Sequence, residues 1–78
     1  MVLEDAPTSR PVYFELLTGR EQEVLEHMAT HLSYPEIAAE LYVSTNTVKT
    51  HTRAVFRKLA VSRRADAVAR ARYYGLIA

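Results

Sequence analysis

SYPEIAAELYVSTNTVKTHTRAVFRKL, residues 33–59, is the stretch that decides the fold. Two capping residues, Ser33 and Ser44, each precede a run of apolar residues at helical spacing. Only residues 42–44 separate the two runs. Because a turn of three to four residues between two steeply crossing helices is the helix-turn-helix geometry, this stretch predicts that motif.

The residues at the crossing fit such a motif. Ala38 is small where the two helices approach, Val48 can wedge into the angle between them, and Val43 can plug the turn. Many helix-turn-helix units have glycine where this chain has Tyr42, since the backbone there often takes a positive φ. A bulky residue is costly in that conformation, so we expect the turn to differ slightly or the helix to end earlier.

Four helices are predicted in all, because the segments on either side of this motif also carry cap signals and helical spacing. The first helix starts with a capping box, Thr18 with Glu21. The second helix starts with another capping box, Ser33 with Glu36. Ser44 is the predicted cap of the third helix, over residues 45–59, and Ser62 that of the fourth, over residues 63–74. Gly75 should stop the last helix, and Leu76 and Ile77 should then fold back on the core.

No strand alternation occurs, so the expected fold class is all-α: a four-helix domain over residues 16–78. Residues 1–15 contain two prolines and are expected to be an N-terminal tail or linker. The 78 residues are 49% apolar and contain no cysteine, which excludes disulfides and thiolate metal sites. The chain has no apolar run long enough for a membrane and no secretory signal, so we expect a cytoplasmic protein with no membrane partner.

Charge is distributed unevenly along the chain. Residues 1–48 hold two basic and eight acidic residues, and residues 49–78 hold eight basic residues and one acid, Asp66. The halves therefore carry −6 and +7, which sum to the net +1. A basic half is typical of a nucleic-acid-binding surface, although two halves that neutralise each other across a helix interface would give the same pattern.

The third predicted helix separates into two sides at about 100° per residue. The inward side is apolar or small and consists of Val48, Thr52, Val55, Phe56 and Leu59. The opposite side is polar or basic and consists of Asn46, Thr50, Arg53 and Arg57, with Lys49 on its flank. No acid occurs from Thr45 to Arg64, whereas an ordinary solvated face would mix acids with bases.

That outward side suits the major groove of DNA. Arg and Lys can donate to guanine O6 and N7, and the methyl group of Thr50 can contact a thymine methyl. The start of the helix, residues 44–47, offers hydroxyls, an amide and unpaired backbone N–H groups to a phosphate oxygen. Such phosphate contacts position a protein on DNA without reading sequence.

These residues as a set resemble the LuxR/NarL-type DNA-binding domain, from Leu17 to Ile77. The landmarks are Leu17-Thr18-x-Arg20-Glu21-x-Glu23-Val24-Leu25, Glu36-Ile37-Ala38, Ser44-x-x-Thr47-Val48-Lys49-x-His51, Lys58-Leu59-x-Val61-x-x-Arg64 and Gly75-Leu76-Ile77. The resemblance implies a helix-turn-helix domain of the winged-helix-like superfamily without a wing. It also implies a transcriptional regulator that binds double-stranded promoter DNA, usually as a homodimer on the DNA, with RNA polymerase as a candidate partner.

The resemblance also implies site residues. Base contacts fall on Lys49, Thr50 and Arg53. Phosphate contacts fall on Ser44, Thr45, Asn46, Thr47 and His51, with Arg57 and Arg64 as nearby basic residues. The dimer contact falls on the fourth helix at Asp66, Ala67, Arg70, Ala71 and Tyr74. Arg64 has an alternative, an ion pair with an acid of the first helix, and His51 could equally be a neutral packing residue.

One departure concerns the end of the first helix, where most members have glycine and this chain has His31. The variant is similar to the C-terminal domain of MalT-like ATP-dependent regulators. Such domains normally follow a sensor, receiver or nucleotide-binding module, so we expect an upstream regulatory domain in the full-length protein.

Other functions find little support in the residues. His27 and His31 have a spacing that can bind zinc, but no third ligand accompanies them, so no metal or other cofactor is expected. No nucleophile arrangement or phosphate loop is present, so an enzyme is not expected. The alternative from another class is a helical protein-interaction module, in which the third helix binds an acidic partner and the fourth makes an oligomer.

Overall fold

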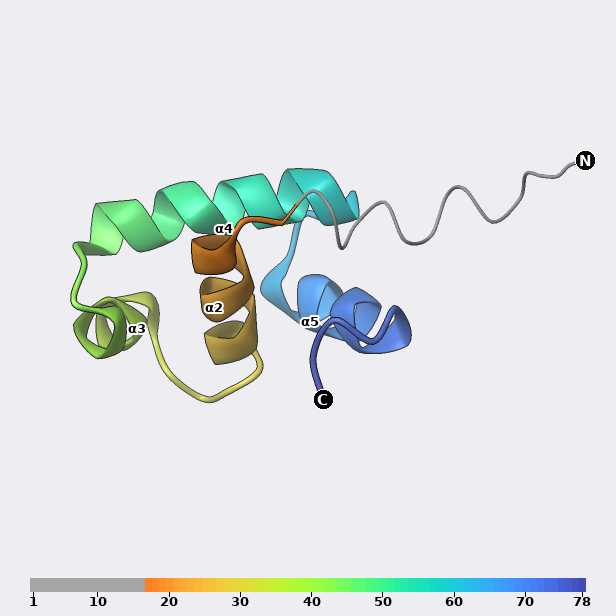
Figure 1. Ribbon diagram of the computed structural model, residues 1–78, viewed down its shortest axis with the longest axis horizontal. Helices are drawn as coiled ribbons and strands as arrows, with labels where there is room; N and C mark the ends of the chain where they lie inside the picture. Colours follow the sequence, from red (N-terminus) through yellow and green to blue (C-terminus); the bar gives the residue numbers. More distant parts are fainter. Residues whose placement is uncertain (1–16) are drawn as a thin grey trace, which may run out of the picture.

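The computed structural model describes residues 17–78, which fold into four helices around one core (Figure 1). In chain order these helices are α2 at Gly19–Met28, α3 at Tyr34–Leu41, α4 at Thr45–Leu59 and α5 at Arg64–Tyr73. Residues 17–78 contain no strand, and the predicted all-α, four-helix fold is confirmed. The predicted tail at residues 1–15 lies outside the described residues.

The longest helix, α4, runs along the top of the molecule in Figure 1, and α2, α3 and α5 all pack against it. Its inward side is the predicted one: Val48, Thr52, Val55 and Leu59 are buried and Phe56 is partly buried. Since apolar burial fixes which side of α4 faces inward, its polar side must face solvent. Within residues 17–78, no helix has the length and apolar character needed to cross a membrane.

Three of the four predicted helix starts are confirmed. Thr18 and Ser33 each form a complete capping box, and the Ser44 hydroxyl accepts a hydrogen bond from the Thr47 N–H at 3.1 Å. The fourth is wrong by one residue, because α5 is capped at Arg63 without a side-chain cap hydrogen bond. Arg63 Nε instead donates to the Asp66 carboxylate at 2.9 Å, so an ion pair, rather than the Ser62 hydroxyl, holds this first turn.

The end of α3 corrects the expectation for the turn. The helix ends at Leu41 as predicted, and Tyr42 takes the left-handed conformation with φ 59°. Its side chain is 95% exposed, so the bulky ring meets no neighbour, and Val43 N–H donates to the Ala38 carbonyl at 3.0 Å. Ala60 ends α4 with the same conformation, φ 57°. This conformation is strained for a residue other than glycine, and both Tyr42 and Ala60 adopt it in spite of the strain.

The C-terminus of α5 follows the prediction. Gly75 adopts φ 76°, and Leu76 N–H then donates to the Ala71 carbonyl at 2.8 Å. This pattern satisfies the last carbonyl groups of the helix. Leu76 is buried and Ile77 packs on the core, as expected.

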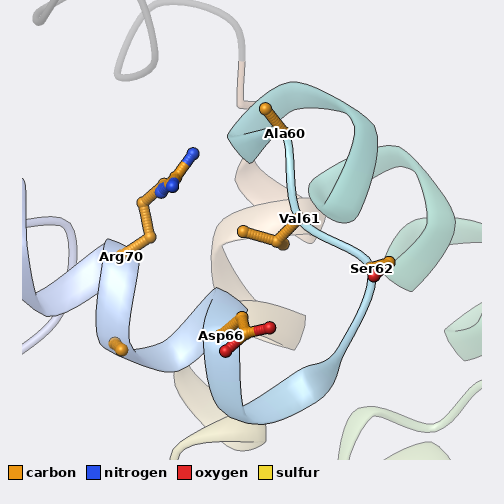
Figure 2. Close-up of a pocket in the computed structure, with 6 residues that line it drawn as sticks. Ala60, Val61, Ser62, Asp66 and Arg70 are labelled. Carbon is orange, nitrogen blue, oxygen red and sulfur yellow. The ribbon is translucent and has the colours of Figure 1, made fainter.

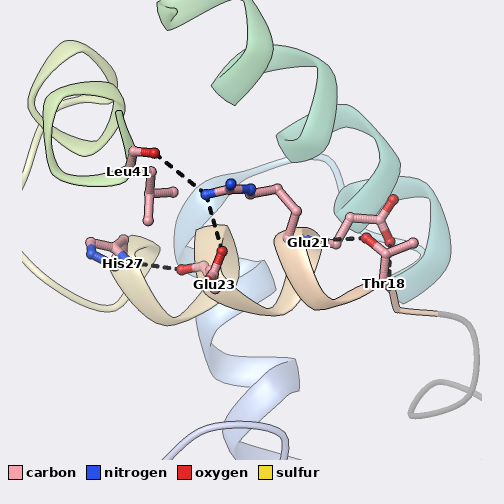
Figure 3. A network of polar contacts seen from close by, with 6 residues as sticks. Thr18, Glu21, Glu23, His27 and Leu41 are labelled. Atoms are coloured by element: carbon pink, nitrogen blue, oxygen red, sulfur yellow. Dashed lines mark hydrogen bonds and ion pairs between the residues drawn. The ribbon is translucent and has the colours of Figure 1, made fainter. Parts of the chain in front are cut away.

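Polar contacts tie α2 to its neighbours. Lys58 Nζ near the end of α4 donates to Glu21 Oε1 at 2.7 Å, and the same oxygen accepts the Thr18 N–H at 3.0 Å. At the opposite edge of α2, Arg20 pairs with Glu23 at 3.2 Å and reaches the Leu41 carbonyl at 3.4 Å. Figure 3 shows the contacts between Thr18 and Glu21 and, farther along α2, Glu23 and the Leu41 carbonyl.

Glu21 is charged in spite of its burial. Burial alone raises the pKa of this carboxyl, but the hydrogen bonds from Lys58 and Thr18 and the positive charges of Lys58 and His51 outweigh it. The net result is a pKa below the ordinary value of 4.5. A group with a lowered folded-state pKa stabilises the fold above its unfolded pKa, and this stabilisation is lost as the pH falls through the folded pKa.

We therefore expect Glu21→Gln to unfold more easily than the wild type near pH 6, by about 1–3 kcal/mol, because a partly buried charge pair is broken. As the pH falls below 4.5 and through the lowered pKa of folded Glu21, the difference should shrink, because wild-type Glu21 then becomes protonated as well. Urea unfolding followed by circular dichroism at several pH values measures this. Glu26→Gln, an exposed position on the same helix, is the control, and equal losses in both variants would contradict the assignment.

Candidate nucleic-acid interface

The outward side of α4 brings the predicted base-contact residues together. Lys49, Thr50 and Arg53 are all exposed, as are Asn46 and Arg57. The part of the chain that the structure describes offers Lys49, Arg53 and Arg57 no ion-pair or hydrogen-bond partner. The face therefore presents three cations and no acid over the length of α4, which makes it complementary to a polyanion.

The start of α4 is organised around its cap. The Ser44 and Thr47 hydroxyls lie 2.9 Å apart, and Ser44 also takes the Thr47 N–H. The N–H groups of Thr45 and Asn46, in the first turn, remain unpaired within residues 17–78 and carry the positive end of the helix dipole. His51 lies half-buried on the other flank, close enough to Glu21 for its charge to lower the pKa of that carboxyl.

Most of the basic side chains in residues 49–78 interact with other groups of the domain. Five of these eight side chains have partners. These are Lys58 with Glu21, Arg63 with Asp66, Arg64 with three α2-end carbonyls, Arg70 with the Leu59 carbonyl, and Arg72 with the Ala78 carbonyl. The remaining three are Lys49, Arg53 and Arg57 on the outward side of α4, so the positive charge available on this surface is smaller than the net +7 indicates.

Arg64, predicted as a phosphate contact or as the partner of an acid, binds backbone carbonyls instead, and among residues 17–78 it pairs with no acid. Its guanidinium donates to the Met28 carbonyl at 3.0 Å and to the Thr30 carbonyl at 3.1 Å. It also lies 5.5 Å from the centre of the Tyr34 ring. Because the terminal carbonyls of a helix lack intrahelical partners, Arg64 acts as a clamp that joins α5 to the end of α2 and to the start of α3.

The fourth helix corrects part of the predicted dimer contact. Ala67 and Ala71 are 0% exposed and belong to the core, so neither side chain can reach a second chain. Asp66, Arg70 and Tyr74 keep some exposure. Alanine occupies four of the ten positions from Ala60 to Ala69, and composition alone does not distinguish buried alanines from exposed ones.

Sequence reasoning missed Tyr34 as a neighbour of the α4 face. The pattern assigned it only to the start of α3, but its ring lines a hollow together with Lys49 and Arg53. The two segments are distant in sequence, and no local spacing relates them. The aromatic side chain next to Pro35 was the only signal available.

Comparison with known proteins fits this geometry. The family model described as GerE, bacterial regulatory proteins of the luxR family, matches residues 15–71. The chain belongs to this family. It is thus the DNA-binding domain of a LuxR-family transcriptional regulator, and the fold has a counterpart in a solved structure of the transcription factor GerE. That structure matches with a TM-score of 0.75 at 33% identity, over 81% of this chain and 94% of GerE.

Relatives include the probable transcriptional regulatory protein NarL of Mycobacterium tuberculosis, 55% identical over 72% of this chain. The CsgBAC operon transcriptional regulatory protein of Escherichia coli is 49% identical over 68%. The regulator MalT of Yersinia enterocolitica is 46% identical over 70%. The matched stretch covers 26%, 24% and 6% of these three proteins, and identity is higher to NarL than to MalT.

The clamp assigned to Arg64 predicts the effect of Arg64→Lys. Lysine keeps the charge but cannot form the planar fork of donors, so we expect the free energy of unfolding to fall by about 1–3 kcal/mol. The salt dependence of DNA binding should stay unchanged. Arg63→Lys, at an exposed ion pair, is the matched control and should change stability little. A salt slope reduced by about one in Arg64→Gln, which removes the charge, would show that Arg64 contacts a phosphate after all.

Proposed function

We propose that this domain binds specific sites in double-stranded promoter DNA by placing α4 in the major groove, as part of a cytoplasmic, non-catalytic transcriptional regulator. The observation that supports this best is the acid-free outward side of α4, where Lys49, Arg53 and Arg57 lack partners among the described residues. Lys49, Thr50 and Arg53 are exposed and are the proposed base readers. The first turn of α4 and His51 are proposed to contact the backbone.

The charge count sets the expected strength of DNA binding. The three cations on the outward side of α4 set a limit on the salt dependence: at about −0.9 for each phosphate neutralised, the log–log slope of affinity against salt for one domain should be no steeper than roughly −3, and less steep where Arg53 contacts a base. Arg53→Ala should weaken binding to a site selected from a random library more than binding to random duplex, because base contacts carry specificity. Mobility shift or fluorescence anisotropy measures both quantities.

Two results would argue against this reading. Absence of binding to any duplex at low salt would favour the protein-interaction module, in which α4 contacts an acidic partner. Equal losses on selected and random duplex would make Arg53 a phosphate contact rather than a base reader.

We further propose that two copies pair on DNA through the exposed side of α5. The surface available is revised by the burial of Ala67 and Ala71 and now centres on Ala69. Figure 2 shows Asp66 and Arg70 near the 60–62 loop, at an open groove of about 680 Å³ that Ala69 also lines. Small residues let two helices approach closely but bury little apolar area, so pairing should be weak without DNA.

A test of pairing is Ala69→Arg, which places like charges at the proposed contact. We expect it to abolish cooperative binding to a duplex with two half-sites and to leave binding to a single half-site intact. Sedimentation should show a monomeric free domain in both wild type and variant. Unchanged cooperativity in the variant, or a stable free wild-type dimer, would contradict this arrangement.

The wider regulator is proposed from the relatives. Those relatives are named as transcriptional regulators, and the first of them are about four times as long as the matched stretch. We propose that an upstream regulatory domain controls this DNA-binding domain and that RNA polymerase is a partner at the promoter.

A further inference from the structure

A hollow of about 230 Å³ lies where the first turn of α3 meets one flank of α4. The rings of Tyr34 and Phe56 form its walls, Lys49 and Arg53 stand along it, and Thr52 lines it as well. Lys49 and Arg53 differ in direction: at about 100° per residue, Lys49 lies on the flank and Arg53 closer to the centre of the outward side. The hollow therefore borders the DNA-facing surface on the Lys49 side.

The Tyr34 ring is held in place by Arg64. The Arg64 guanidinium lies 5.5 Å from the Tyr34 ring centre, and the carbonyls of Met28 and Thr30 fix Arg64 at 3.0 and 3.1 Å. A cation over a ring face stabilises the ring in that position. Because Arg64 is itself fixed by these carbonyls, its contact with the ring restrains the position of Tyr34 at the hollow.

The Thr52 hydroxyl at the hollow lacks a hydrogen-bond partner among the described residues. The residue is only 4% exposed. A buried hydroxyl without a partner is costly. Threonine in a helix populates two χ1 rotamers, so a rotation about the Cα–Cβ bond can turn the hydroxyl toward an acceptor that enters the hollow.

We propose that the hollow seats one phosphodiester group of the bound DNA, with the adjoining deoxyribose carbons against the rings of Tyr34 and Phe56. Lys49 supplies the charge, and the Tyr34 and Thr52 hydroxyls donate to the phosphate oxygens. The inference rests on the proposed DNA binding and deepens it: Lys49 moves from base reading to backbone contact, and Tyr34, Thr52 and Phe56 join the interface.

The choice of a phosphate over a base edge follows from the donors. The hollow combines a cation without a partner among the described residues, two hydroxyls and no acid, and anionic oxygens are the acceptors that such a set prefers. A thymine methyl would fit the apolar walls but would leave the Thr52 hydroxyl unsatisfied. A phosphate held here, beside the base readers, would set the register of α4 in the groove.

Three variants test the seat by anisotropy on a selected duplex and on a random duplex. Lys49→Ala should weaken binding to both by a similar factor of roughly 10 and reduce the salt slope by about 0.9. Tyr34→Phe keeps the ring over which Arg64 lies, and Thr52→Val keeps the shape of the side chain. Each should weaken both duplexes by about 3- to 10-fold, although Thr52→Val should raise the midpoint of thermal unfolding by removing the unpaired hydroxyl.

A duplex scan with single neutral methylphosphonate linkages locates the contact. One such linkage should weaken wild-type binding by roughly 10-fold. The same linkage should weaken binding by Lys49→Ala and by Tyr34→Phe only slightly, because these variants already lack part of the contact. A loss for Lys49→Ala confined to the selected duplex, with altered preference at one base pair, would overturn the seat in favour of base reading. Wild-type affinity in both hydroxyl variants would overturn it too. If the wild type binds neither duplex, the proposed function itself fails, a result that the variant pattern cannot imitate.

Discussion

The burial of one side of α4 is the constraint on which the rest of the structure depends. Val48, Val55 and Leu59 have no exposed surface, and α2, α3 and α5 each contribute to covering them. Since a helix cannot rotate without exposing this stripe to water, the direction of every polar residue on α4 is set by the core. The outward position of Thr50, Arg53 and Arg57 is thus a consequence of core packing. Their orientation is fixed before any partner binds.

The features predictable from sequence are those with local causes. Helix caps at Thr18, Ser33 and Ser44 and the stop at Gly75 depend on residues within one turn, and the apolar stripe of α4 depends on periodicity. The inward side of α5 was harder to predict, because alanine occupies both sides of the helix. Ala67 and Ala71 are buried, whereas Ala65 and Ala69 are exposed. Their difference arises from where α5 docks on α2 and α4, which is a property of the tertiary structure.

The site shows the same division. The residues of the α4 face could be predicted, but the partners of Arg64 could not, because backbone carbonyls at the end of α2 carry no mark in the sequence. Tyr34 was hidden for a related reason, since its ring meets α4 only after α3 has docked. Tyr42 was predicted wrongly for a different reason. A positive φ is unfavourable for a bulky residue, but the exposed Tyr42 ring meets no neighbour, and the chain keeps the left-handed conformation there.

The small number of unpartnered cations on α4 has a consequence for how a regulator of this kind would occupy the genome. A domain that makes about three phosphate contacts, as we propose, would hold arbitrary DNA only briefly at cellular salt and would not be sequestered by the bulk of the chromosome. The proposed pairing would turn the second encounter into an intramolecular one at a high effective concentration. Avidity would then supply the residence time that a single domain lacks, and promoter occupancy would rise steeply with the fraction of paired molecules.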